Sequence, residues 1–358
     1  MRLTTIIILL FSINLLLAGN QPYTLGLNLH QGMILNHADA RRGLGTGISL
    51  GTMYIAEASI HFHTLGTRAW HKYLGYPRWG MSAMIINTGN TKFGGTGYAW
   101  LIYKSLRLVD SRYIDMTFRI GGGLCTFSDP YHEVSNPTNL WISAPVNASL
   151  NAQIEVAANI HPKAKILVHG AFIHFSNGAI AMPNLGINFA TVGIGVKYTP
   201  HPERIVYRTD TNFSITKRNF LHLTAAIGYR VLPDYGTTYF PIYTLGIMYG
   251  RRCGTVSKIN VGLDYFRDLS LLDDNYNVAN KVDISRVGLF FGYEAMFGKL
   301  SFPFGMGYYL YKKTSRDADF YIKVGLRYHY FKNLFAQINL KTHWGQADNI
   351  EWTFGYSL

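Results

Sequence analysis

The sequence has few charged residues, two cysteines and, after its first residues, no long apolar run. Only 15% of its residues are charged, against 25 tyrosines, 21 phenylalanines and 36 glycines. Beyond residue 19 no uninterrupted apolar stretch reaches about 18 residues, so we expect no helical membrane span. Aromatic residues favour β-strands, and glycine is common where strands curve. This composition is not typical of an ordinary soluble enzyme.

Residues that bind metals are also scarce or scattered. His30, His61 and His71 fall in different predicted strands and loops, and no cluster of His and Cys has the spacing of metal ligands. We therefore predict neither a metal site nor a cofactor.

Acidic residues are fewer than basic ones, which gives a formal net charge of +13. An exported basic protein could bind nucleic acid, but the sequence has no clustered run of Lys and Arg, so no nucleic acid is expected. Scattered basic residues suit a membrane leaflet of phosphorylated glycolipid. They are equally compatible with an ordinary solvated surface.

The first nineteen residues have the pattern of a secretory signal peptide. Arg2 supplies the positive charge, residues 6–17 form the apolar core, and Ala18 and Gly19 are small residues suited to cleavage. A retained membrane anchor is the alternative. We therefore predict export, with residues 20–358 as the mature protein.

Several later segments alternate between apolar and polar or small residues. Residues 319–330 place large apolar side chains at every second position, with Lys323, Gly325 and Arg327 between them. Segments of about ten residues with this alternation, ending in aromatic residues, are typical of transmembrane antiparallel β-barrels. A soluble β-sandwich has the same period. The predicted signal peptide, the aromatic content and the charged residues on the polar face favour the barrel.

The pattern gives about 16 strands, or 14 if two pairs are merged. The connections 126–141 and 177–186 are long and fall at the predicted extracellular end, whereas 63–78 and 201–218 are long at the inner end. The last of these leaves eight strands on each side, so two eight-stranded barrels are possible. We favour one closed barrel over residues 20–358 because nothing repeats between the halves.

The two cysteines are predicted to remain unpaired. In this topology Cys125 and Cys253 lie at opposite ends of the barrel, roughly 25 Å apart, which is far beyond the reach of a disulfide.

The segment 172–188 has the character of a reaction centre. His174 and Ser176 are two residues apart in a predicted strand, so both point to the same face. That face is the more apolar one, and we expect it to face lipid. If the next strand pairs as a hairpin, Asn188 returns beside them. An imidazole next to a hydroxyl is the minimum equipment for an activated serine, although both could be plain rim residues of a hairpin.

The motif His-x-Ser-Asn followed by Pro-Asn-x-Gly resembles that of the outer-membrane lipid A 3-O-deacylases. Members of that family are β-barrels that hydrolyse an ester-linked acyl chain of lipopolysaccharide. The resemblance implies that His174 is the general base, Ser176 the nucleophile and Asn177 a candidate oxyanion donor. It also implies that Asn184 and Gly186 shape the loop.

The resemblance covers about residues 22–200, and residues 201–358 contribute additional strands without an assigned counterpart. The family has a glutamate fourteen residues after the histidine, where this sequence has Asn188. Asn188 is therefore expected to replace the orienting carboxylate, with Asp129 or Glu133 as alternatives from a neighbouring loop. The implied substrates are acyl esters of lipid A in the outer membrane.

The main alternative is a non-catalytic porin or lipid transporter, because a barrel of 16 strands encloses a water-filled lumen. A soluble binding module is a third possibility. In the channel reading, charged inward residues would line an open path; these are Lys258, Asp264, Lys323 and Arg327. Inward packing of Tyr and Phe would argue against it.

Overall fold

The computed structural model contains two β-barrels and very little helix. The residues it describes are 21–35, 48–209, 218–232, 238–272, 284–314, 317–344 and 346–358. The predicted signal peptide lies outside these residues and stays a prediction. None of the helices in the described ranges is long and apolar enough to cross a membrane.

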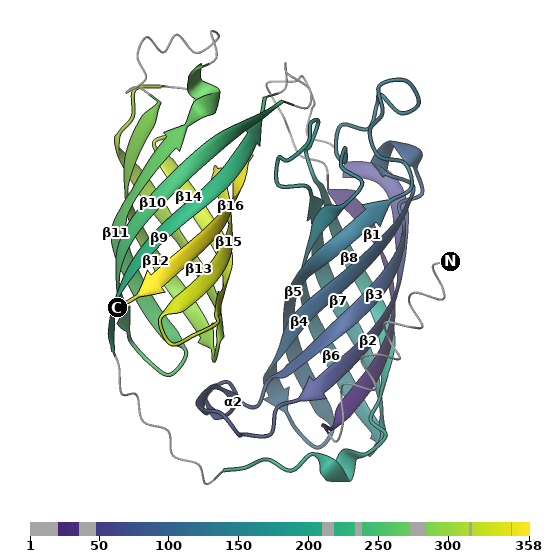
Figure 1. Ribbon diagram of the computed structural model, residues 1–358. Coiled ribbons are helices and arrows are strands. Elements are labelled where there is room, and N and C mark those ends of the chain that lie inside the picture. Colours follow the sequence, from purple (N-terminus) through teal and green to yellow (C-terminus); the bar gives the residue numbers. More distant parts are fainter. Residues whose placement is uncertain are drawn as a thin grey trace. The chain divides into compact units, whose positions relative to one another are not determined.

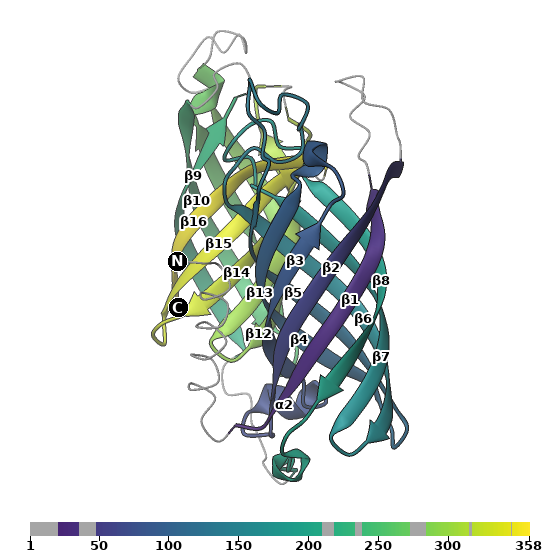
Figure 2. The same ribbon diagram turned by 90° about the vertical axis from the view of Figure 1, so that its right-hand side faces the viewer.

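Eight antiparallel strands form the first barrel (Figure 1). They are β1 (Tyr23–Leu35), β2 (Ile48–His63), β3 (Arg78–Asn87), β4 (Thr96–Asp110), β5 (Ile114–Phe127), β6 (Asn147–His161), β7 (Ala164–Ser176) and β8 (Ile187–Tyr198). Each strand pairs with its neighbours in sequence, and β1 also pairs with β8. In Figure 2, β1 and β2 run obliquely along the wall, as strands of a closed barrel must.

The second barrel repeats this arrangement with the remaining strands. They are β9 (Asn219–Val231), β10 (Tyr239–Arg252), β11 (Ser257–Asp268), β12 (Ser285–Phe297), β13 (Leu300–Tyr311), β14 (Phe320–His329), β15 (Leu334–His343) and β16 (Gln346–Ser357). Here β9 pairs with β10 and with β16, which closes the ring.

The prediction of sixteen strands is confirmed, but the prediction of one closed barrel is wrong. Because β8 pairs back to β1 and β16 back to β9, each half closes on itself. An eight-stranded barrel has an interior just wide enough to be filled by side chains, so each half can be a complete unit. The alternative of fourteen strands is also wrong. Both cysteines are free, as predicted.

The strands place large apolar side chains outward, and pack polar, aromatic and aliphatic side chains together inward. On β7 the exposed residues Ile166, Val168 and Phe172 alternate with the buried residues Leu167 and His169. On β8 the even-numbered residues from Val192 onward are likewise exposed. The more apolar, even-numbered face of this hairpin therefore points outward, and its contact with lipid stays a prediction.

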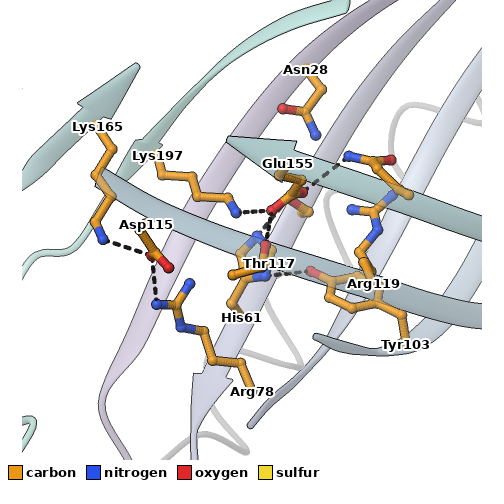
Figure 3. A network of polar contacts seen from close by, with 12 residues as sticks. Asn28, His61, Arg78, Tyr103, Asp115, Thr117, Arg119, Glu155, Lys165 and Lys197 are labelled. Carbon is orange, nitrogen blue, oxygen red and sulfur yellow. Dashed lines mark hydrogen bonds and ion pairs between the residues drawn. The ribbon is translucent and has the colours of Figure 1, made fainter. Parts of the chain in front are cut away.

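Paired charges fill the middle of the first barrel (Figure 3). Arg119 contacts Glu57 at 2.6 Å, Lys197 pairs with Glu155, and Arg78 and Lys165 reach Asp115 at 2.9 and 2.8 Å. These side chains come from β2, β3 and β5 to β8, so the network ties most of the wall together. Buried charges are tolerated when each has such a partner.

The interior of the second barrel is also filled, which argues against the channel alternative. Lys323 pairs with Asp264 at 3.0 Å, and Lys258 and Arg327 share Glu294 at 2.7 and 2.9 Å. Phe266 and Tyr321 pack inward beside them, with ring centroids 5.2 Å apart. The cavity that remains among these groups is about 20 Å³, room for about one water molecule.

The two long connections of the first barrel that broke the expected loop pattern pack against each other. One contains the helix α2 (Ala69–Tyr73) and the other the 3₁₀ turn Pro202–Arg204. The Arg208 N–H donates to the Leu65 carbonyl at 2.9 Å, and the rings of Tyr76 and Tyr207 lie 4.5 Å apart. Other short 3₁₀ turns are Thr91–Phe93 and Leu269–Leu272.

Candidate active site

Three polar side chains meet on the outer face of the β7–β8 hairpin. The register places His174 directly opposite Asn188, and the period of two places Ser176 beside His174. His174 Nδ1 lies 2.6 Å from Asn188 Oδ1, and His174 Nε2 lies 3.0 Å from Ser176 Oγ. The structure thus brings together the three residues that the sequence singled out.

These two contacts define one protonation pattern. A carbonyl oxygen only accepts, so His174 donates to Asn188 from a protonated Nδ1. Nε2 then carries a lone pair and accepts from the Ser176 hydroxyl. This is the tautomer a general base needs, because its free nitrogen faces the hydroxyl that must lose a proton.

An apolar core lies directly behind the three residues. The inward neighbours Ile173, Phe175 and Phe189 are fully buried, and Phe175 stacks edge-on with Phe127 and Phe189 at 5.4 and 5.3 Å. A close-packed interior holds backbone positions firmly. The strand ends that carry the polar trio are therefore anchored from inside the barrel.

Gly186 shapes the wall of the site next to the imidazole. Its φ of +72° is in the left-handed region, and a Cβ there would lie 2.9 Å from His174 Cε1 and 3.2 Å from Ser176 Cβ. Glycine satisfies both the backbone angle and the close approach. The loop role implied by the resemblance thus has a physical basis at this position.

The loop from 177 to 186 is held against the longer loop from 128 to 146. The Leu185 and Gly186 N–H groups donate to the carbonyls of Leu140 and Trp141, both at 3.1 Å. Asn139 is fully buried and accepts from the N–H groups of Trp141 and Ile142, both at 3.1 Å. Sequence reasoning missed this support, because backbone pairing between two loops leaves no pattern in the side chains.

Asn177 and Asn184 tie the loop to itself and to its neighbour. The Asn177 N–H donates to Asn184 Oδ1 at 3.1 Å, and Asn177 Nδ2 donates to Ser143 Oγ at 3.1 Å. Both donor groups of Asn177 thus contact protein acceptors. In this arrangement the residue acts as a loop brace, which differs from the oxyanion role that the resemblance implied.

The alternative third members lie elsewhere in their loop. Asp129 accepts from Ser128 Oγ at 2.5 Å, and Glu133 is exposed. The imidazole nitrogen that an orienting group would contact already faces Asn188. The geometry therefore favours Asn188 over both acids.

The last hairpin of the second barrel carries different groups. The outward positions near the end of β15 are Leu340 and Thr342, whereas His343 faces inward and contacts Tyr309 Oη at 3.0 Å. The described residues of this hairpin thus place no His and Ser together on the outer face.

Asp317, His343 and Asp348 bring potential metal-ligand atoms within 4.8 Å of one another, a cluster that the sequence did not predict. Arg286 pairs with Asp317 at 2.8 Å, and both Arg230 and Lys341 pair with Asp348. Three cations already balance these carboxylates, so the donor set does not suit a divalent ion.

Comparison with known protein families gives two matches. Residues 54–197 match the family "Lipid A 3-O-deacylase (PagL)", and residues 219–358 match "Acyloxyacyl hydrolase, C-terminal domain". The first barrel belongs to the lipid A 3-O-deacylase family. It is accordingly a hydrolase of acyl esters, and the predicted resemblance is confirmed. The view that residues beyond 200 lack a counterpart is corrected, since β9–β16 coincide with the second match.

A search of curated proteins found no match. Among solved structures, CdiB from Acinetobacter baumannii is 9% identical, with 94% of this chain and 60% of that chain covered and a TM-score of 0.19. A mutant porin of Rh. blastica is 12% identical, covering 94% and 100%, with a TM-score of 0.21. The ferric enterobactin receptor mutant of Pseudomonas aeruginosa is 11% identical, covering 93% and 60%, with a TM-score of 0.25. The chain spans about 60% of the length of CdiB.

Proposed function

We propose that the first barrel removes an ester-linked acyl chain from lipid A by a serine–histidine mechanism in the outer leaflet of the outer membrane. The observation that carries this proposal is the hydrogen-bonded series Asn188–His174–Ser176 on the outward face of the β7–β8 hairpin. The family match supplies the substrate class.

The reaction begins with proton transfer from Ser176 Oγ to His174 Nε2. The serine oxygen attacks the ester carbonyl. The tetrahedral intermediate then collapses, and the imidazolium protonates the departing sugar oxygen, which leaves as a hydroxyl group. The acyl chain is then bound to Ser176 as an ester. A water molecule, deprotonated by the same nitrogen, releases the fatty acid.

Asn188 holds the imidazole in the productive tautomer without supplying negative charge. A carboxylate would also stabilise the imidazolium, and its loss costs about four orders of magnitude in turnover in a soluble serine triad, mostly through the wrong tautomer. Here the 2.6 Å contact keeps the tautomer. The orienting part of the role is therefore retained and the electrostatic part is absent.

The position of the trio suits a substrate that remains in a membrane. Exposed apolar side chains surround both barrels, including Val168 and Val192 beneath the trio, as expected for strands that face lipid. Ser176 lies at the barrel end that carries the long loops, at the end of this apolar wall. A lipid ester can then reach the serine without leaving the leaflet.

The test uses the full-length protein, purified in detergent, with lipid A as the only ester present. Release of a fatty acid by the parent, and its loss on Ser176→Ala, is the expected result. The Ser176 hydroxyl is half-buried at the end of β7 and contacts His174, outside the packed interior of the barrel, so the variant should assemble normally. If the Ser176→Ala protein releases fatty acid at the parental rate, the serine mechanism is wrong.

A further inference from the structure

A second feature on the outer wall belongs to the other barrel. A groove of about 630 Å³ runs over β9 and β16, which are neighbours in the wall (Figure 1). Its sides are large apolar groups, with Leu223 on β9 and Phe354 and Tyr356 on β16. Tyr330 and Phe331, from the turn between β14 and β15, border it at one end.

A small residue lies in the floor of this groove. Ala225 is exposed on β9, opposite Phe354 on β16, and leaves a gap between the larger outward side chains. Thr224, Gly246 and Gly355 also line the groove, from inward positions of their strands. A hollow bordered by aromatic rings suits a flexible hydrocarbon chain, which can follow an irregular apolar surface.

The end of the barrel where Tyr330 and Phe331 lie is strongly basic. Exposed cations stand in the short turns and at the start of β9; they are Arg218, Arg251, Lys299 and Lys332. In the described part of the chain none of the four forms an ion pair. The turn segments 251–256, 298–299 and 330–333 contain no Asp or Glu.

The cations and the groove adjoin each other along the chain. Lys332 follows Phe331 directly, and Arg218 comes just before β9, whose Leu223 lines the groove. Arg251 belongs to the pair Arg251–Asn219 in the β9–β10 ladder, next to Arg218. An apolar groove that ends at positive charges without ion-pair partners is complementary to a molecule with hydrocarbon chains and an anionic head group.

We infer that this groove binds one anionic phospholipid, with its acyl chains over β9 and β16 and its phosphate against Lys332 and Arg218. The inference rests on the membrane placement in the proposed function, and it is independent of the chemistry at Ser176. A zwitterionic lipid carries an ammonium group beside its phosphate, so the cluster of cations favours a lipid with net negative charge.

The test measures lipids retained by the full-length protein in native mass spectrometry. The protein is incubated in detergent with equal amounts of phosphatidylglycerol and phosphatidylcholine that have identical acyl chains. Retention of phosphatidylglycerol should exceed that of phosphatidylcholine. Each Lys or Arg near an anionic lipid contributes about fivefold, so Lys332→Gln with Arg218→Gln should lower the preference at least fivefold.

The matched control removes two exposed cations from turns of the first barrel, by Lys163→Gln with Arg204→Gln. This control should keep the parental preference. Phe331→Ser should reduce retention of both lipids, and free glycerol phosphate should not displace the bound lipid.

Three results would overturn the inference. They are an equal loss of preference in the control, no loss in the Lys332/Arg218 variant, and displacement by glycerol phosphate, which would indicate a site for phosphate alone. Fatty acid release from lipid A is recorded in the same samples and should stay parental in every variant. A parent that lacks this activity but prefers phosphatidylglycerol would contradict the proposed function and leave the lipid site standing.

Discussion

At the scale of single residues, the proposed mechanism makes Asn188 the residue that sets how well His174 acts as a base. The amide contacts His174 Nδ1 at 2.6 Å and orients the ring, but it cannot offset the positive charge that the ring acquires during attack. The site therefore has the geometry of a triad with a neutral third member.

We expect Asn188→Asp and Asn188→Glu to retain or raise the rate of lipid A deacylation, because each adds charge at the same position. Asn188→Ala should lower it more than about tenfold, since the tautomer is then no longer fixed. Initial rates of fatty acid release give the comparison. A parental rate for Asn188→Ala would mean that Asn188 takes no part, and that the third member must be sought at Asp129 or Glu133.

Gly186 offers a second prediction at this scale. A methyl group at this position would press on the His174 ring, so Gly186→Ala should reduce deacylation at least about tenfold while the barrel still assembles. Gly75→Ala is the matched control, because Gly75 has a φ of +66° and no atom within 4 Å of the added carbon. Both variants carry the same backbone strain. If both lose activity equally, strain and not the contact with His174 is responsible.

The trio could be predicted from the sequence because two simple periodicities determine it. Alternation in β7 sets Ser176 beside His174, and an antiparallel hairpin returns Asn188 opposite His174. The loop contacts could not be predicted in this way. Whether Asn177 faces a substrate or Ser143 depends on how two irregular loops meet, and the folding of such loops follows no period.

At the scale of elements, the β7–β8 hairpin has one apolar face that points outward and one face that points toward the packed interior. Val168 and Val192 are 57% and 70% exposed, although they are apolar, whereas their neighbours His169 and Thr191 are buried. Soluble proteins show the opposite pattern, with apolar side chains inside. Apolar side chains outside are expected of strands that face lipid.

Val168→Arg and Val192→Arg should each cost about 2 to 4 kcal/mol near the membrane midplane and impair assembly. Assembly is measured as the fraction of heat-modifiable, membrane-inserted protein. Val134→Arg is the control, since Val134 is exposed in the loop between β5 and β6 and should tolerate the charge. Normal insertion of both strand variants would mean that this face does not contact lipid.

At the scale of the whole molecule, each barrel is complete without strands from the other. The ladder from β1 to β8 closes through the β1–β8 pairing, and the ladder from β9 to β16 closes in the same way. The sequence could not predict this closure, because alternation is a local property. It is identical for one barrel of sixteen strands and for two barrels of eight.

Residues 1–209 alone should therefore assemble, and their rate of lipid A deacylation should be within about threefold of that of the full chain. Loss of a catalytic acid or base lowers a rate far more, typically by about 100-fold or greater. The second barrel expressed behind residues 1–20 should show no deacylation, because the described residues of its final hairpin place no His and Ser together on the outer face. Activity in the second barrel alone would show that the site has been placed in the wrong half.

The central claim is that Ser176, activated by His174, removes an acyl chain from lipid A. Mass spectrometry of lipid A, extracted from cells that express either the parent or the Ser176→Ala protein at equal levels in the outer membrane, tests it most directly. The account predicts lipid A lighter by one ester-linked acyl chain with the parent, and unmodified lipid A with Ser176→Ala. The same loss of an acyl chain in both samples would contradict it.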